Sequence, residues 1–268
     1  MARNEVGINV LDGYQRDGFV SGVTILTPHD AAIHRQHLER AESVFGSSLH
    51  YVNKVHTALK SPLEVATHPK LLDVVSSLIG PNVLVYNVTF IIKEAMTPTF
   101  VSWHQDLTYW GLEGGKQVSA WLALSTADEQ SGCMEMIPGS HQWGEQAQVT
   151  GDDPNNVLLQ SQTIKKVDET DAIACALAPG QVSLHHGWTV HCSRPNRSTD
   201  RRIGLNIQYI TPDMRQEKVD FDSALLVRGE DQFQFYRQDT PATDYELSAQ
   251  SARRLRIATE EYQRIAGT

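Results

Sequence analysis

The spacing of apolar residues changes near residue 82, and this change limits what the chain can fold into. Apolar positions upstream recur every three or four residues, as in helices, whereas those downstream alternate with polar ones, as in strands. Gly and Pro separate the downstream runs, which we expect to be strands: Val83–Ile92, Val118–Ser125, Cys133–Ile137, Gln181–His186 and Ile203–Ile210. Short strands after a helical beginning predict a mainly β fold with flanking helices, a barrel or jelly roll covered on its outside.

Helix signals lie in the first third of the chain and at its end. Thr27 is a good N-cap before Pro28, and Gly46 is a good stop, so we predict a helix over 28–45. A second helix is predicted over 69–78, before Gly80-Pro81, and a last one over 247–265.

The chain contains no linker, internal repeat or low-complexity segment that would divide it. Apolar residues make up 40% of it, enough for one substantial core. We therefore expect a single domain over residues 1–268, with a helical part over about 1–80, a barrel over about 82–212 and a C-terminal cover over about 213–268.

Charge and composition argue against several classes of partner. A net charge of −9 disfavours nucleic acid, and the arginines between residues 194 and 202 suit a small anion better. The longest apolar run, Val83–Ile92, is too short to span a membrane, and the polar first residues are not typical of a signal peptide. Three cysteines without a CxxC pair exclude a disulfide scaffold and suit a reducing, cytoplasmic location.

The predicted strand over 202–209 alternates polar and apolar side chains. Arg202, Asn206 and Gln208 fall on one face, and Ile203 with the following odd-numbered apolar residues falls on the other. An exposed edge strand would explain this pattern, but other predicted strands also have a polar face. A barrel with a polar interior explains them together, and we expect a functional site inside it.

Two short motifs contain side chains that bind metals. His104 and Asp106 are two residues apart, so in an extended chain both side chains point the same way. His191 and Ser193 form a second motif, and Arg202 lies on the next predicted strand, where it can meet Ser193 on the same side of the sheet. Two histidines and one carboxylate are the ligands of non-heme Fe(II) oxygenases. Taken singly, each residue could equally be a core histidine or a structural ion-pair partner.

In combination, these motifs resemble the phytanoyl-CoA dioxygenase family. The sequence has Trp-His-Gln-Asp-Leu at 103–107, His-Cys-Ser at 191–193 and an arginine eleven positions after His191. Asp-Gly-Phe-Val at 17–20, Ala-Trp-Leu at 120–122 and Ile-Pro-Gly-Ser-His at 137–141 follow the family's order. The similarity extends over roughly residues 10–212. It implies a double-stranded β-helix that uses Fe(II), 2-oxoglutarate and O₂, with ascorbate as a reductant.

The resemblance also implies roles for individual residues. His104, Asp106 and His191 would bind iron, and Arg202 with Ser193 would hold the far carboxylate of 2-oxoglutarate. Trp121 matches a tryptophan that lines the cosubstrate pocket, and Lys54 occupies the place of a family lysine near the site. One branch of the superfamily replaces the carboxylate with Ala or Gly and uses a halide. Because Asp106 is present, the chain resembles a hydroxylase.

Three other histidines compete for the role of the distal ligand. His185 has Asn196 at the eleven-residue spacing, whereas His186 has an arginine there but a tryptophan in place of the serine. His141 belongs to the Pro-Gly-Ser-His turn and suits a structural role. Two other functions also remain open: a cupin-like zinc hydrolase, which uses similar ligands, and a barrel that binds without catalysis.

The expected substrate is a small molecule, hydroxylated at an unactivated C–H bond. Long connections often form lids, so we expect Gly144–Thr170 and Thr211–Thr240 to cover the site. Tyr109, Trp110 and Trp143 are candidates for its walls.

Overall fold

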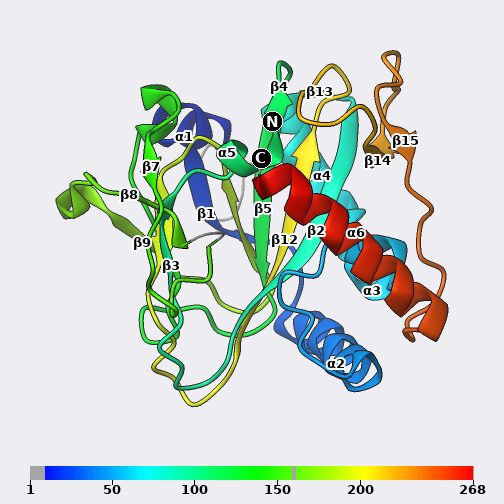
Figure 1. Cartoon of the computed structure of the whole chain (residues 1–268), viewed down its shortest axis with the longest axis horizontal. Coiled ribbons are helices and arrows are strands. Elements are labelled where there is room, and N and C mark those ends of the chain that lie inside the picture. Colours follow the sequence, from blue (N-terminus) through cyan, green and yellow to red (C-terminus); the bar gives the residue numbers. More distant parts are fainter. Residues whose placement is uncertain (1–9, 159–160, 268) are drawn as a thin grey trace.

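The structure is a computed structural model and describes residues 10–158 and 161–267. Two β-sheets form its centre (Figure 1). The larger, seven-stranded sheet has the order β1 (Phe19–Thr24), β10 (Gln181–His185), β5 (Gln117–Ala123), β12 (Arg202–Ile210), β2 (Val83–Lys93), β14 (Ser223–Arg228), β15 (Arg237–Gln238). The four-stranded sheet has the order β3 (Val101–His104), β11 (His191–Ser193), β6 (Met134–Met136), β9 (Ile173–Cys175).

Short pairs and helices complete the architecture. The pairs are β4 (Leu112–Glu113) with β13 (Arg215–Gln216), and β7 (Gln148–Val149) with β8 (Thr163–Ile164). The helices are α1 (Val10–Asp17), α2 (Pro28–Phe45), α3 (Lys60–Ala66), α4 (Pro69–Ile79), α5 (Leu107–Trp110) and α6 (Ala249–Gly267), with 3₁₀ turns η1 (Val55–Thr57), η2 (Ser140–Trp143) and η4 (Glu169–Asp171). No helix in the described ranges is long and apolar enough to cross a membrane.

The predicted helices form where their capping residues place them. Thr27 Oγ1 accepts a hydrogen bond from the backbone N–H of Asp30 at 3.1 Å, which begins α2. Gly46 ends it with φ of 82°, a conformation that costs glycine little. Helix α4 begins at Pro69, as predicted, and runs to Ile79, one residue beyond the predicted end, with Gly80 as its C-cap.

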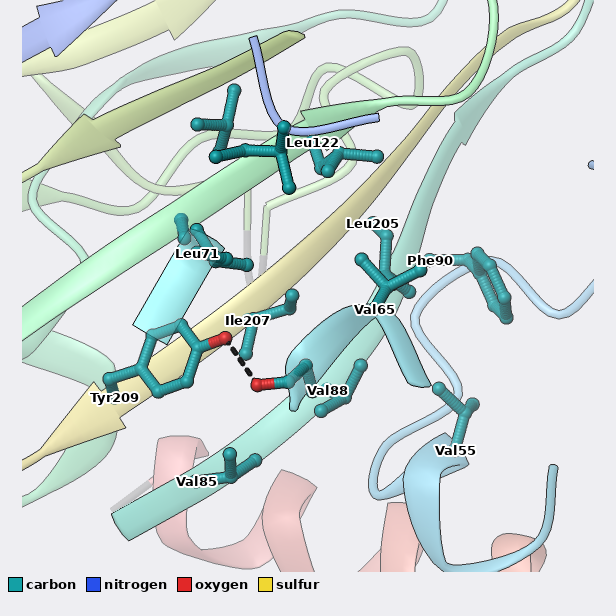
Figure 2. Packing of buried hydrophobic residues seen from close by; sticks show 14 of the residues in the cluster. Val55, Val65, Leu71, Val85, Val88, Phe90, Leu122, Leu205, Ile207 and Tyr209 are labelled. Carbon is teal, nitrogen blue, oxygen red and sulfur yellow. Dashed lines mark hydrogen bonds between the residues drawn. The ribbon is translucent and has the colours of Figure 1, made fainter. Parts of the chain in front are cut away.

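The main core lies between the larger sheet and the helices that cover its outer face. The odd-numbered side chains of β12 are buried there, together with Leu71 of α4 and Val65 of α3 (Figure 2). Tyr209 also belongs to this core, and its hydroxyl donates a hydrogen bond to the carbonyl of Ala66 at 2.7 Å (Figure 2). This packing fixes which face of β12 points outward, since a shift by one residue would reverse both faces.

The polar face of β12 points into a cavity between the two sheets. Arg202, Asn206 and Gln208 all line this cavity, as the alternation predicts. In the neighbouring strands, Asn206 lies opposite Thr89 of β2 and Trp121 of β5, which also line it. The polar side chains of neighbouring strands therefore line the same cavity.

Two predictions about the fold need correction. The segment expected to be helical over 1–80 contains strand β1, which pairs with β10 at the edge of the larger sheet; residues 1–9 lie outside the described part. The prediction that Ser193 and Arg202 meet on one sheet required strands β11 and β12 to be neighbours. Instead, the two strands belong to different sheets. Both side chains nevertheless line the same cavity, from opposite sheets.

Candidate active site

His104 and His191 are directly paired across strands β3 and β11, with ring centroids 4.1 Å apart. The Nδ1 of His104 donates to the Ser102 carbonyl at 2.9 Å, and that of His191 donates to the Thr189 carbonyl at 2.9 Å. These bonds fix the tautomer in which each Nε2 keeps its lone pair. Burial, followed by the nearby His104, holds the pKa of His191 well below its ordinary value, so its ring is neutral and able to bind a metal.

Asp106 completes the group from a turn rather than from a strand. Strand β3 ends at His104, and Asp106 has φ of −61° and ψ of −44°, at the start of α5. The premise of an extended His-x-Asp segment was therefore wrong. The carboxylate nevertheless reaches the histidines: Oδ1 lies 3.5 Å from Nε2 of His104 and 3.7 Å from Nε2 of His191.

The other oxygen of Asp106 is held by two donors. Ser119 Oγ donates to Oδ2 at 2.8 Å, and His185 Nε2 lies 3.2 Å from the same atom. Burial raises the pKa of Asp106, but the neighbouring imidazoles of His104, His185 and His191 outweigh it and hold this pKa well below its usual range. The group is an ionised carboxylate with Oδ1 directed at the histidines.

These residues form a group suited to a divalent metal ion. Among the described residues, His104, Asp106 and His191 offer ligand atoms that all lie within 4.8 Å of one another. Two imidazoles and one carboxylate fit Fe(II), which would keep further positions open for cosubstrate. The same three donors also fit a catalytic zinc ion.

A buried positive charge lies at the other end of the cavity. Arg202 is 1% exposed, and its Nε and Nη2 have no hydrogen-bond partner in the described part of the molecule. Burial lowers its pKa to about 10, so the guanidinium is still charged at neutral pH. It lies 5.0 Å from the centre of the Trp121 ring, and a Cβ on Gly204 would fall 1.9 Å from that ring. Gly204 thus makes room for the tryptophan that contacts Arg202.

Ser193 lines the cavity near this charge and has a partner that the sequence did not suggest. Lys93, the register neighbour of Arg202, donates to Ser193 Oγ at 2.7 Å and to the Ser193 carbonyl at 3.0 Å. Burial, followed by the charge of Arg202, lowers the pKa of Lys93 to about 6. The only clue in the sequence was a lysine ending an apolar strand.

Lys54 does not lie where the resemblance placed it. It is absent from the described side chains that line the cavity, and its ammonium contacts the Tyr86 carbonyl, the Ser223 carbonyl at 2.6 Å and Asp239 at 3.2 Å. From the same loop, Tyr51 lines the cavity instead, with φ of 56°. The turn therefore directs the tyrosine inward and the lysine away.

The structure distinguishes the three other histidines that were candidates for the distal metal ligand. His186 and His141 pack against each other, at 5.6 Å between ring centroids, and neither is among the described residues lining the cavity. His185 does line it, but its Nε2 faces Asp106 Oδ2, which marks it as a hydrogen-bond donor. Arg201, just before β12, faces outward and pairs with Glu42 and Glu94.

The cover of the site comes from part of the predicted first lid and from the C-terminal helix. Val157 and Leu158 of the predicted first lid line the cavity, whereas no described residue of 211–240 does. Helix α6, within the predicted C-terminal cover, contributes Tyr262, Gln263 and Ala266. Tyr109 and Trp110 form walls as expected, but Trp143 is 51% exposed and lies outside.

Gln105, between the two metal-binding residues, was also missed. Its side-chain amide donates to the carbonyls of Gly144 and Trp188 at 2.9 and 2.8 Å, and its oxygen accepts from the N–H of Gln146 at 2.8 Å. It therefore fastens the beginning of the cover to the metal-binding motif.

Comparison with known proteins agrees with this geometry. The chain is 28% identical over 146 residues to a probable alpha-ketoglutarate-dependent hypophosphite dioxygenase of Stutzerimonas stutzeri, covering 54% of this chain and 51% of the relative. It spans between 51% and 66% of the length of the first curated relatives it matches.

Solved structures resemble it over more of their length. The apo structure of the non-heme monooxygenase ThoJ superposes with a TM-score of 0.83 at 29% identity, covering 97% of this chain and 98% of that one. CytC3 with Fe(II) and alpha-ketoglutarate, at 21% identity and a TM-score of 0.64, covers 89% of this chain and 95% of that one and shares the fold. The family model for phytanoyl-CoA dioxygenase matches residues 14–204, and the chain belongs to this family.

Proposed function

We propose that the protein is a dioxygenase dependent on Fe(II) and 2-oxoglutarate that hydroxylates an unactivated C–H bond of a small molecule. Succinate and CO₂ would be its other products. The observation that carries this proposal is a cavity with His104, Asp106 and His191 at one place and the unpaired buried Arg202 at another. A metal and a dicarboxylate cosubstrate account for both.

Each residue has a role in this proposal. His104, Asp106 and His191 would hold Fe(II), which together with bound 2-oxoglutarate and O₂ supplies the oxidising chemistry. Arg202 would fix the far carboxylate of 2-oxoglutarate by charge-assisted hydrogen bonds, with Ser193 as a further partner. Trp121 would keep the guanidinium in place, and α6 would help exclude water.

The two alternative functions explain fewer features of the site. A zinc hydrolase would use the same three metal ligands, but it does not explain why the charged Arg202 is buried in the cavity. A non-catalytic barrel gives no reason for three ligand atoms within 4.8 Å of one another. The cytoplasmic location suggested by the cysteines stays a prediction.

Succinate release tests the proposal. The full-length chain would be incubated with Fe(II), ascorbate, O₂, 2-oxoglutarate and fractions of a metabolite extract. We expect at least one fraction to stimulate succinate formation, and Asp106→Ala to abolish the stimulation. Arg202→Ala should lose the stimulation at the same 2-oxoglutarate concentration, and Arg201→Ala, whose side chain faces outward, is its matched control. Product formation that does not need 2-oxoglutarate would contradict the proposal and favour a hydrolase.

A further inference from the structure

The cavity has a second polar region, distant from Arg202. Arg202 and Gln208 lie on the same face of β12 and are six residues apart, which corresponds to about 20 Å along a strand. Gln208 lies opposite Ser119, whose hydroxyl contacts Asp106, and it adjoins the phenol of Tyr262 in the covering helix. The Gln208 end is therefore next to the metal-binding group and outside the reach of the cosubstrate carboxylate at Arg202.

This end of the cavity offers no ion-pair partner to a substrate. Apart from histidines, the charged side chains that line the cavity in residues 10–158 and 161–267 are Asp106 and Arg202. Asp106 is committed to its two donors and to the metal, and Arg202 to 2-oxoglutarate. A carboxylate or phosphate at the Gln208 end would find no cationic side chain among these lining residues, and burying a charge without such a partner is strongly unfavourable.

What this end does offer is uncharged hydrogen bonding. The side-chain oxygens of Asn206 and Gln208 have no partner in the described structure, and Gln208 is only 5% exposed. Asn87 beside them is fully used, since it donates to Asn53 Oδ1 at 2.6 Å and accepts from the N–H of Lys54 at 2.9 Å. Buried amide oxygens normally accept a hydrogen bond, so two unpaired oxygens facing a cavity point to a ligand that donates to them.

The surrounding walls are aromatic. Tyr109 and Trp110 of α5 and Tyr262 of α6 line the same cavity. Aromatic rings provide a large apolar surface with few rotatable bonds. An apolar carbon framework that carries one uncharged polar group fits these walls and the two amides.

We propose that the substrate of this enzyme presents a neutral hydroxyl or amide to Gln208 and Asn206, and packs its carbon framework against the aromatic walls. This inference rests on the proposed function, which supplies the metal and cosubstrate. It separates the chain from the Stutzerimonas relative, whose name states an anionic substrate, hypophosphite. A site that hydrogen-bonds a neutral group discriminates strongly against ligands that lack it.

Three probes that share one ring test this inference: cyclohexanecarboxamide, cyclohexylmethanol and cyclohexanecarboxylate. Each would be titrated calorimetrically, without oxygen, into the full chain saturated with Fe(II) and 2-oxoglutarate. We expect the amide or the alcohol to bind at least tenfold more tightly than the carboxylate. Gln208→Leu should reduce this preference to less than threefold, and Gln208→Arg should favour the carboxylate. Gln130→Leu, at an exposed position outside the cavity, should preserve the preference.

Three binding results would contradict the inference. The inference is overturned if the carboxylate binds as tightly as the neutral probes, if none of the three binds at 50 mM, or if Gln208→Leu keeps the full preference. Binding of Fe(II) and 2-oxoglutarate is measured first in every variant. A wild-type chain that does not bind them refutes the proposed function itself, and a variant that does not bind them is replaced by Gln208→Met.

Discussion

His185 Nε2 lies 3.2 Å from Oδ2 of Asp106, whereas His104 and His191 approach the other oxygen, Oδ1. Ser119 donates to the same oxygen at 2.8 Å. Together these two contacts leave Oδ1 for a metal and restrain rotation of the carboxylate. His185 is thus a positioning residue, because its Nε2 carries the proton that the carboxylate accepts.

The first prediction follows from this contact. His185→Leu should weaken Co(II) binding about 10–100-fold, as is typical when a partner of a metal ligand is lost. His185→Gln, which can donate from a similar place, should recover most of that affinity, and His186→Leu should leave it unchanged. Competition with a chelator measures each affinity. Loss of metal as complete as in His191→Ala would make His185 a ligand, and wild-type affinity in His185→Leu would refute its role.

The ligands themselves give the second prediction. Asp106→Ala should retain its fold, since the change removes a buried charge, but it should lose most Fe(II) affinity because the only anionic donor is gone. His191→Ala should behave in the same way, and His186→Ala should not. Iron content after dialysis, together with circular dichroism, measures both effects. Stoichiometric iron in a fully active Asp106→Ala protein would exclude Asp106 from the metal site.

The third prediction concerns the cosubstrate. Arg202→Ala should weaken 2-oxoglutarate binding by at least about a hundredfold, since an unpaired buried carboxylate costs about 3–5 kcal/mol. Ser193→Ala should cost about 1–2 kcal/mol, because one hydroxyl is lost. Iron binding should stay nearly intact in both variants. Calorimetric titration of 2-oxoglutarate into each protein checks this, and unchanged binding in Arg202→Ala would assign the role to another arginine.

Gly204 provides the fourth prediction. A Cβ at this position would fall 1.9 Å from the Trp121 ring, so Gly204→Ala should lower the free energy of unfolding by about 1–3 kcal/mol and weaken 2-oxoglutarate binding. Gly13→Ala is the control, since nothing lies within 4 Å of its added Cβ. Urea denaturation measures both variants. Equal stability of the two would show that Trp121 does not need the space.

Local patterns predicted a large part of this structure. The ends of α2 followed from Thr27 and Gly46, because capping depends on residues close in sequence. The two faces of β12 followed from alternation alone, since successive side chains point to opposite sides of a strand. The same rule placed Arg202 inside the cavity.

Other features depend on contacts between distant segments, which one sequence does not display. The position of His185 beside Asp106 follows from the pairing of β10 with β5, and the contact of Lys93 with Ser193 joins the two sheets. Tyr51 points inward in place of Lys54 because both residues have positive φ angles, which residues other than glycine rarely adopt. Spacing could suggest the metal ligands, but it could not identify the residues that hold them.

The absorption spectrum of the apo-protein, mixed without oxygen with Fe(II) and 2-oxoglutarate, is the measurement that bears most strongly on the proposed function. An α-keto acid chelated to ferrous iron has a metal-to-ligand transition, so we predict a weak visible band. The band should be lost in Asp106→Ala and should require far more 2-oxoglutarate in Arg202→Ala, while zinc should suppress it by occupying the same ligands. A colourless wild-type mixture in which iron and 2-oxoglutarate are both shown to be bound would mean that the cosubstrate does not chelate the metal, and would contradict the proposed function.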